Sequence, residues 1–166
     1  MAEEHRFCII LDRLRSAHNT GNIFRIAEAV GASEIIACGY TPAPPHPKLE
    51  KTAMGTDKIV PCRVFPDAAS AIKALRAEGF RMILAAEPGC QEDFAWIRDY
   101  EFPLAVIFGN EALGVSQEAL ALADGRVSLP MAGSKASINV GNAAAAIAYA
   151  IVSKTGKVFD QGENKC

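Results

Sequence analysis

The sequence has no long hydrophobic run, no excess of positive charge and no closely paired cysteines. Its longest apolar run, residues 143–152, is too short to span a bilayer. The net charge of −2 excludes a nucleic-acid binder that relies on bulk positive charge. The acidic N-terminus also lacks the order of basic, apolar and small residues of a signal peptide. Composition alone therefore predicts a small cytoplasmic enzyme without membrane contact, and suggests a metabolite as its substrate.

The five cysteines are odd in number and widely spaced, with no C-x-x-C pair. This pattern predicts neither a zinc site nor a disulfide framework, and it favours a reducing compartment. We expect Cys8, Cys38, Cys62 and Cys90 to be small apolar fillers and Cys166 to be a tail thiol. The three histidines are scattered, so no metal site is predicted.

Apolar runs of strand length alternate with helix-like segments along the 166 residues. This alternation predicts one α/β domain, residues 1–166, with a mainly parallel sheet flanked by helices. Asn19, Asp67 and Ser116 have side chains suited to helix N-caps. The expected strands are residues 7–11, 34–38, 81–86, 104–108 and 126–129, and the expected helices are residues 19–30, 67–77, 116–122 and 139–153.

Charge and proline are unevenly distributed. Residues 86–124 contain eight acidic residues against Arg98 alone, which leaves 16 basic and 11 acidic residues elsewhere. Residues 40–47 contain four prolines and precede a lysine-containing stretch, so we expect a stiff, extended loop there. The basic remainder, including the arginines around the first strand and helix, could form a rim that binds phosphates.

The glycines of one loop suggest a nucleotide site. Gly109 and Gly114 have the spacing of a P-loop, but Val115 occupies the lysine position, which disfavours a phosphotransferase. The chain also has no G-x-G-x-x-G, no G-x-S-x-G and no H-E-x-x-H motif. The usual dinucleotide, hydrolase and metalloprotease sites are therefore unsupported.

Three polar clusters remain, at residues 19–25, 106–115 and 129–140. They read N-T-G-N-I-F-R, then V-I-F-G-N-E-A-L-G-V, then L-P-M-A-G-S-K-A-S-I-N-V. In this order they resemble the three signature motifs of the SpoU/TrmH family of RNA ribose 2′-O-methyltransferases. Leu129 and Ile138 replace similar apolar residues, and Gly141 stands where the family often has serine.

The resemblance implies the SPOUT fold, with a deep trefoil knot near the C-terminus. True knots are nearly absent from proteins, so the apolar pattern would not predict one. The resemblance also implies S-adenosylmethionine as methyl donor, and a homodimer that shares its sites across the interface. The apolar helix after Asn139 would pack in the core and at that interface, although a simple core helix explains its composition equally well.

The resemblance assigns catalytic roles to Arg25, Asn19, Glu111, Ser137 and Asn139. Arg25 would activate the ribose hydroxyl. Because arginine is effectively always protonated, we expect its guanidinium to hold the ribose and its phosphate and to stabilise alkoxide charge, and the role of true base stays open. Glu111 would brace the motif loops. Asn19, Ser137 and Asn139 would orient ribose or cofactor, with helix capping as a competing explanation.

The resemblance places a further set of residues around the cofactor. Gly109 would let the cofactor approach the backbone closely. The adenosine pocket would form largely from backbone groups, so side-chain identity constrains these positions weakly. The full expected cofactor-binding set is Ala85, Gly109, Leu129, Met131, Ser137 and Ile138.

The sequence thus predicts a cytoplasmic, homodimeric RNA 2′-O-ribose methyltransferase that uses S-adenosylmethionine. Small relatives without an additional RNA-binding domain often act on tRNA, so tRNA is the favoured substrate. Ribosomal RNA is the alternative substrate. A non-catalytic RNA- or cofactor-binding module on the same fold is the alternative class, but such a module would be expected to lose Arg25 or Asn139, and both are present.

Overall fold

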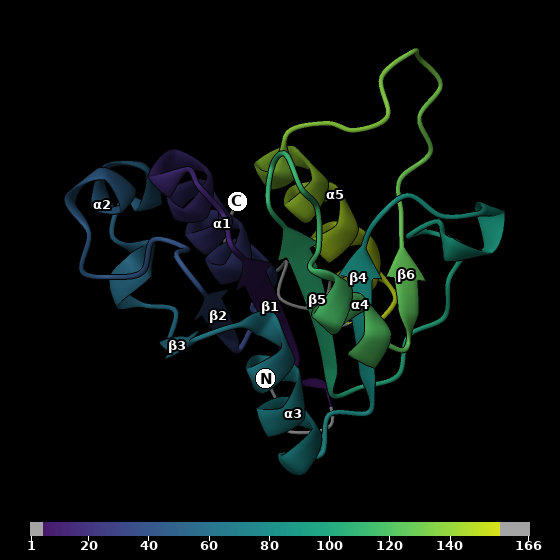
Figure 1. Ribbon diagram of the computed structural model, residues 1–166, viewed down its shortest axis with the longest axis horizontal. Helices are drawn as coiled ribbons and strands as arrows, with labels where there is room; N and C mark the ends of the chain where they lie inside the picture. Colours follow the sequence, from purple (N-terminus) through teal and green to yellow (C-terminus); the bar gives the residue numbers. More distant parts are fainter. Residues whose placement is uncertain (1–4, 157–166) are drawn as a thin grey trace.

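The computed structural model describes residues 5–156, which form a six-stranded sheet with helices on both faces. Every neighbouring pair of strands is parallel, and the strand order is β3-β2-β1-β5-β4-β6 (Figure 1). The strands are β1 (Phe7–Asp12), β2 (Glu34–Cys38), β3 (Cys62–Phe65), β4 (Met82–Ala86), β5 (Leu104–Gly109) and β6 (Gly125–Val127). The predicted α/β class and parallel sheet are confirmed.

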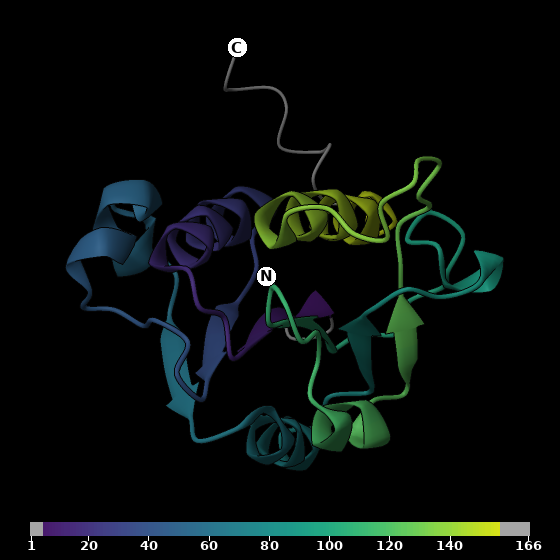
Figure 2. The same ribbon diagram turned by 45° about the horizontal axis from the view of Figure 1, so that its top comes forward.

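Within residues 5–156, α-helices and short 3-10 turns connect these strands, and one further helix follows the last strand. In Figure 2, α1, α2 and α5 form a layer on one face of the sheet, whereas α3 and α4 cover the other face. The helices are α1 (Ala17–Val30), α2 (Pro47–Ala53), α3 (Ala68–Ala77), α4 (Gln117–Leu122) and α5 (Val140–Ser153), and the 3-10 turns are η2 (Thr56–Lys58) and η3 (Gln91–Asp93).

Both faces of the central strands are buried, which explains their continuous apolar runs. In β1, Phe7, Ile9 and Leu11 join the core cluster under α1 and α5, whereas Cys8 and Ile10 join the cluster under α3. Successive side chains of a strand point to opposite faces. Because of the same alternation, only every second residue of β4 and β5 faces the side of the sheet that α5 covers.

The predicted N-cap at Asn19 is wrong, whereas Ser116 is the N-cap residue of α4 as predicted. The N-cap of α1 is Ser16, whose side chain accepts from Asn19 N, so this helix begins at Ala17. Asn19 therefore lies inside the first turn, and its side chain is available for other contacts. Ser116 occupies the N-cap position of α4 without a capping bond from its side chain. Asp67 caps α3 as predicted.

Two elements were not predicted. Strand β3 lies at the sheet edge and is only partly buried, so it lacks a continuous apolar run. Helix α2 starts at the last proline of the stiff segment, where His46 Nδ1 accepts from Leu49 N as the N-cap. Gly21 allows α2 to pack closely on α1, since a Cβ at Gly21 would lie 2.5 Å from Leu49 O.

The four cysteines in the described range are free, but they do not all fill the core. Cys8 and Cys38 are buried, and burial raises the pKa of each thiol to about 12. Cys62 is half-buried. The expectation for Cys90 is wrong, because this side chain is exposed. Cys166 lies outside the described residues. No helix within residues 5–156 is both long enough and apolar enough to cross a membrane.

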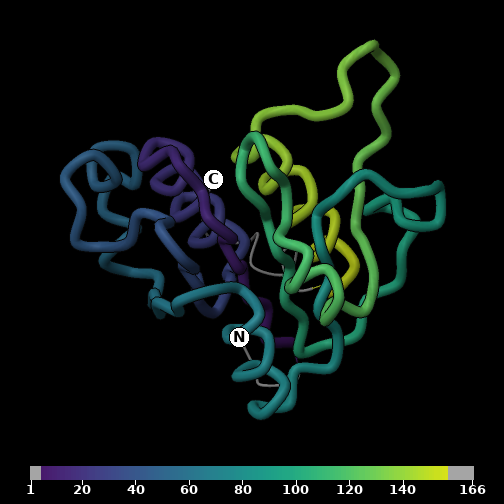
Figure 3. The backbone as a smooth tube through the Cα atoms, viewed as in Figure 1, coloured from purple at the N-terminus to yellow at the C-terminus, as the bar shows by residue number. Residues whose placement is uncertain are grey.

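The segment between β6 and α5 carries the third motif. Figure 3 shows this segment, residues 128–139, projecting beyond the carboxyl ends of the strands before it returns to α5. Residues 130–139 are exposed along its whole length. The projecting segment forms one wall of a cavity at the carboxyl ends of the strands.

Candidate active site

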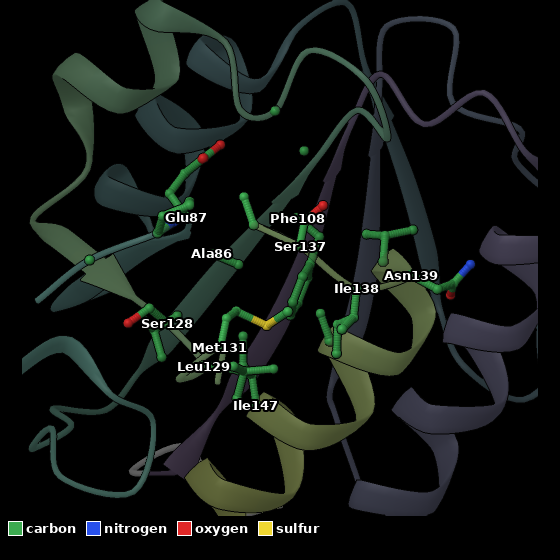
Figure 4. Close-up of a pocket in the computed structure, with 18 of the residues that line it drawn as sticks. Ala86, Glu87, Phe108, Ser128, Leu129, Met131, Ser137, Ile138, Asn139 and Ile147 are labelled. Atoms are coloured by element: carbon green, nitrogen blue, oxygen red, sulfur yellow. The ribbon is translucent and has the colours of Figure 1, made fainter. Parts of the chain in front are cut away.

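A cavity of about 920 Å³ opens at the carboxyl ends of β4, β5 and β6, on the face covered by α5 (Figure 4). Its floor contains Phe108, Val127 and Ile147, and Leu129 and Met131 extend the apolar lining. The loops after β5 and β6 supply most of the remaining wall. Ligands of open α/β sheets bind at this edge.

The loop after β5 is built around Asn110, which is almost fully buried. Asn110 Oδ1 accepts from Ala112 N at 2.8 Å and from Leu113 N at 2.9 Å, which closes a tight turn. Its Nδ2 donates to Arg13 O at 2.7 Å and to Tyr40 Oη at 3.0 Å. The amide thus fixes the loop to the ends of β1 and β2. No role was predicted for Asn110, although an asparagine directly after glycine in a loop is a turn signal.

Gly109 lines the cavity at the start of this loop. A Cβ on Gly109 would lie 2.2 Å from both Gly114 C and Val115 N, where the loop folds back. The returning backbone therefore excludes any side chain at Gly109, which is an intramolecular reason for a glycine there. The close approach of the cofactor stays a prediction. Glu87, which follows β4, stabilises the point where the loop folds back, because its Oε1 accepts from Val115 N at 2.6 Å.

Glu111, Asn19 and Asn139, one residue from each motif, form a chain of side-chain hydrogen bonds. Asn19 Nδ2 donates to Glu111 Oε1 at 3.2 Å, and Asn139 Nδ2 donates to Asn19 Oδ1 at 3.1 Å. Glu111 also accepts from Arg15 N at 3.0 Å and from Ser16 N at 3.2 Å. The structure thus brings three of the expected catalytic residues together at the edge of the cavity.

The hydrogen bonds to Glu111 favour its ionised form. Partial burial alone would raise the pKa of this carboxyl, but backbone N–H groups, including those of Arg15 and Ser16, and the amide of Asn19 together lower the pKa below its ordinary value. Glu111 is therefore an anionic acceptor at neutral pH. Its oxygens accept hydrogen bonds from residues at the start of α1, which fits the predicted role of Glu111 in bracing the motif loops.

Asn139 also caps α5, because its Oδ1 accepts from Gly141 N at 2.8 Å and from Asn142 N at 3.3 Å. Capping, one of the two explanations for Asn139, is thus confirmed, and the bridge to Asn19 uses a different atom of the same amide. Its contact with ribose or cofactor stays a prediction. Ser137 and Ile138 line the cavity from the projecting segment, as do Leu129 and Met131.

Three expected site residues do not line the cavity. Asn19 reaches its edge through the bond to Glu111, whereas the other two lie apart from it. Ala85 is buried in the core cluster under α3, and its neighbour Ala86 lines the cavity instead, because successive strand residues face opposite sides. Arg25 is exposed on α1 and is not among the lining residues. No hydrogen bond or ion pair holds its side chain within residues 5–156. Glu87, which the sequence analysis did not assign, does line the cavity.

The cavity suits a ligand of the size and mixed polarity of S-adenosylmethionine. Its volume is within the range of small-molecule sites, and apolar side chains dominate its floor. Ser128 Oγ is buried at its wall and has no hydrogen-bond partner among the described residues. Glu87, Glu111 and Lys135 add charges of both signs to the lining, two acidic and one basic. No group of three or more potential metal ligands occurs within residues 5–156.

A model of the SpoU rRNA methylase family matches residues 6–149. The chain belongs to this family. The tRNA (guanosine(18)-2′-O)-methyltransferase of Thermus thermophilus is 40% identical to this SpoU chain over 141 residues, which cover 85% of the chain and 71% of that enzyme. The family consists of RNA 2′-O-methyltransferases that use S-adenosylmethionine.

Solved structures extend the likeness of the SpoU chain to the fold. The SpoU methyltransferase AviRb of Streptomyces viridochromogenes, in complex with AdoMet, superposes with a TM-score of 0.80 at 30% identity, over 93% of this chain and 62% of AviRb. A structure concerned with the 2-OH methylation of C/U34 on tRNA superposes with a TM-score of 0.79 at 25% identity, over 93% of this chain and 99% of that one. The fold is the SPOUT fold with its knot.

Proposed function

We propose that this protein transfers a methyl group from S-adenosylmethionine to a ribose 2′-hydroxyl of tRNA. The observation that carries this proposal is the hydrogen-bonded chain Glu111–Asn19–Asn139, which joins all three motifs at the edge of a cavity of cofactor size. The 40% identity to a tRNA methyltransferase favours tRNA over ribosomal RNA. Free buried thiols and an RNA substrate are consistent with a cytoplasmic enzyme.

The chain contributes binding, orientation and charge to this reaction. Bound S-adenosylmethionine would supply an electrophilic methyl group on a sulfonium. Leu129, Met131 and Ile138 would hold the apolar parts of the cofactor, and the loop that begins at Gly109 would provide backbone groups. Excluding water from this apolar site strengthens the electrostatic interactions inside it.

Arg25 would act on the ribose rather than on the cofactor. Its exposed guanidinium is unengaged in the described structure and can present a planar fork of donors to a phosphate and to the attacking 2′-oxygen. The 2′-oxygen would gain negative charge as its proton leaves to water, and it would spend that charge in forming the bond to the donated methyl group. A fixed positive charge beside the oxygen would favour the loss of the proton.

We also propose that the protein is a homodimer whose two copies share their active sites. Arg25 does not line the cavity of its own chain, so a second copy could supply this residue to that cavity. The outer face of α5 offers small side chains such as Ala145 and Ala146, which are half-buried, together with Tyr149, which is 49% exposed. Such a face permits close helix contact between two copies.

Two tRNA positions are the candidates for methylation. Guanosine 18 is the first, because the relative at 40% identity modifies it. The C/U34 position is the second, because the structure concerned with that reaction matches 93% of this chain and nearly all of its own length. Methylation of unmodified tRNA transcripts with labelled S-adenosylmethionine, followed by nucleoside analysis, distinguishes the two. Labelled 2′-O-methylguanosine indicates position 18, and labelled 2′-O-methylcytidine or 2′-O-methyluridine indicates position 34.

A mixing experiment tests the shared site. If Arg25 serves the cavity of the partner, heterodimers of Arg25→Ala and Asn139→Ala chains contain one fully intact site, and mixing two inactive proteins restores activity. If Arg25 serves its own cavity, both sites of each heterodimer are defective and the mixture stays inactive. Sedimentation of the wild-type protein gives the oligomeric state independently, and a monomer at micromolar concentration contradicts the dimer.

A further inference from the structure

Tyr40 presents an aromatic ring to solvent in a fixed position. It lies two residues after the end of β2 and is 58% exposed. On one side of it, Gly39 has a φ of +64°, and on the other side Thr41 is buried. Thr41 Oγ1 donates toward Cys38 O and Leu11 O and accepts from Leu14 N, so the backbone at Tyr40 is held between the ends of β1 and β2.

The hydroxyl of Tyr40 is held by the loop that forms the cavity wall. Asn110 Nδ2 donates to Tyr40 Oη at 3.0 Å, although the two residues are 70 positions apart in sequence. The same Asn110 closes the turn that presents Leu113, which is 71% exposed. One end of the tyrosine is therefore fixed beside the cofactor cavity, and the apolar ring remains in water.

The segment that follows β1 lies beside Tyr40 and contains two arginines. A Cβ on Gly39 would lie 3.0 Å from Arg13 Cγ, so the Arg13 side chain passes next to the backbone of Tyr40. The Arg13 guanidinium donates to Asp12 Oδ1 at 3.2 Å and to Gly114 O at 3.4 Å, while Arg15 is exposed two residues later. Exposed aromatic rings beside arginines are typical of surfaces that bind unpaired nucleotides.

We propose that Tyr40 is a stacking platform for an unpaired base of the RNA substrate, adjacent to the ribose that is methylated. This inference rests on the proposed function and deepens it by naming a substrate-contacting residue outside the three motifs. A fixed ring loses little entropy on binding, and every base has a face that can stack on it. RNA is favoured over a second protein chain as the occupant because the flanking exposed charge, Arg15, complements phosphate.

The test compares Tyr40→Leu with Tyr40→Phe as its matched control. Tyr40→Phe retains the ring and loses only the bond from Asn110, whereas Tyr40→Leu loses the ring as well. We expect Tyr40→Leu to raise KM for tRNA about tenfold or more, because base stacking on an aromatic side chain typically contributes this much. Tyr40→Phe should stay within about threefold of wild type. The kcat, the S-adenosylmethionine Kd and the melting temperature should change little in Tyr40→Phe.

Each other outcome overturns the stacking role. An equal rise of KM in both variants shows that the hydroxyl only positions the loop at Asn110. An unchanged KM in Tyr40→Leu shows that no base stacks there. If Tyr40→Leu forms a weaker dimer in sedimentation, and its tRNA affinity falls in proportion to the fraction of dimer, the ring contacts a second copy of the chain instead of RNA. If the wild-type protein methylates no tRNA, the proposed function itself is wrong. If the wild type is active and Tyr40→Leu has an unchanged KM for tRNA, only the stacking role of Tyr40 is wrong.

Discussion

Asn139 Nδ2 donates a hydrogen bond of 3.1 Å to Asn19 Oδ1 across 120 residues of sequence. This contact joins the start of α5 to the first turn of α1, and Asn19 passes the connection on to Glu111. The three motifs are thus connected through side chains before any ligand binds. We expect this chain of bonds to hold the three motif loops in place at the edge of the cavity.

Replacing Asn139 separates its two functions. Asn139→Ala loses both the cap of α5 and the bond to Asn19, so unfolding should become easier by about 1 kcal/mol. Asn139→Ser retains a good N-cap side chain but cannot reach Asn19 with a donor. We expect both variants to lose most kcat and only Asn139→Ala to melt earlier. Wild-type kcat in Asn139→Ser would show that the bridge to Asn19 is dispensable.

Arg25→Ala should abolish turnover while S-adenosylmethionine binding stays near normal, because the guanidinium serves the ribose. The side chain is exposed and unengaged, so the melting temperature should stay within a degree or so of wild type. Arg25→Lys keeps the charge without the planar fork and should recover only a small part of the activity. Calorimetric cofactor titration and single-turnover methylation measure the two effects. Full activity in Arg25→Ala would refute the assignment.

Glu111 makes stability depend on acid pH. Its folded-state pKa lies below the ordinary value of 4.5, so the carboxylate stabilises the fold above pH 4.5. That contribution is lost as the pH falls through the folded-state value. Glu111→Gln should therefore be less stable than wild type at pH 7, and the gap should close on acidification. Urea unfolding at a series of pH values measures this gap, and a gap independent of pH would contradict the hydrogen-bonded carboxylate.

Gly109→Ala should distort the cavity loop. The new Cβ would stand 2.2 Å from the backbone at Gly114 and Val115, and such overpacking typically costs about 1–3 kcal/mol. Gly133→Ala is the matched control, since a Cβ there meets nothing within 4 Å. Thermal unfolding of the two proteins should show a loss only for Gly109→Ala, accompanied by weaker cofactor binding. Equal melting temperatures would mean that the loop accommodates a side chain.

RNA binding should weaken as salt is added, because phosphate contacts release counterions. Arg15 is an exposed cation whose backbone N–H bonds to Glu111, so Arg15→Ala should reduce the slope of log Kd against log salt by about one. Filter binding at several salt concentrations provides both slopes. A flat response in the wild type would rule out a basic rim.

The sequence predicted the parts of the fold that bury continuous apolar runs. β1, β2 and β5 are buried on both faces, and their runs were visible without any family knowledge. β3 was missed because Val64 is 64% exposed and Arg63 pairs with Glu34 and Glu78 at the sheet edge. Helix α2 was missed because a proline-rich segment leads into it. A proline in the first helical turn is compatible with a helix and does not mark only a loop.

The site was predicted less completely than the fold. The motifs identified Asn19, Glu111 and Asn139, but only the folded chain shows that their side chains bond to one another. Asn110 and Tyr40 were not predicted as site residues, because their contact joins strand ends that are distant in sequence. Spacing along one helix also gives no indication of whether Arg25 faces its own cavity or that of another copy.

The most direct test of the account is methyl transfer from labelled S-adenosylmethionine to bulk tRNA and, in parallel, to ribosomal RNA, followed by digestion to nucleosides. The account predicts label in a 2′-O-methylated nucleoside of tRNA, with none in the Arg25→Ala protein. Label on a base, label confined to ribosomal RNA, or tight ATP binding without S-adenosylmethionine binding would contradict it.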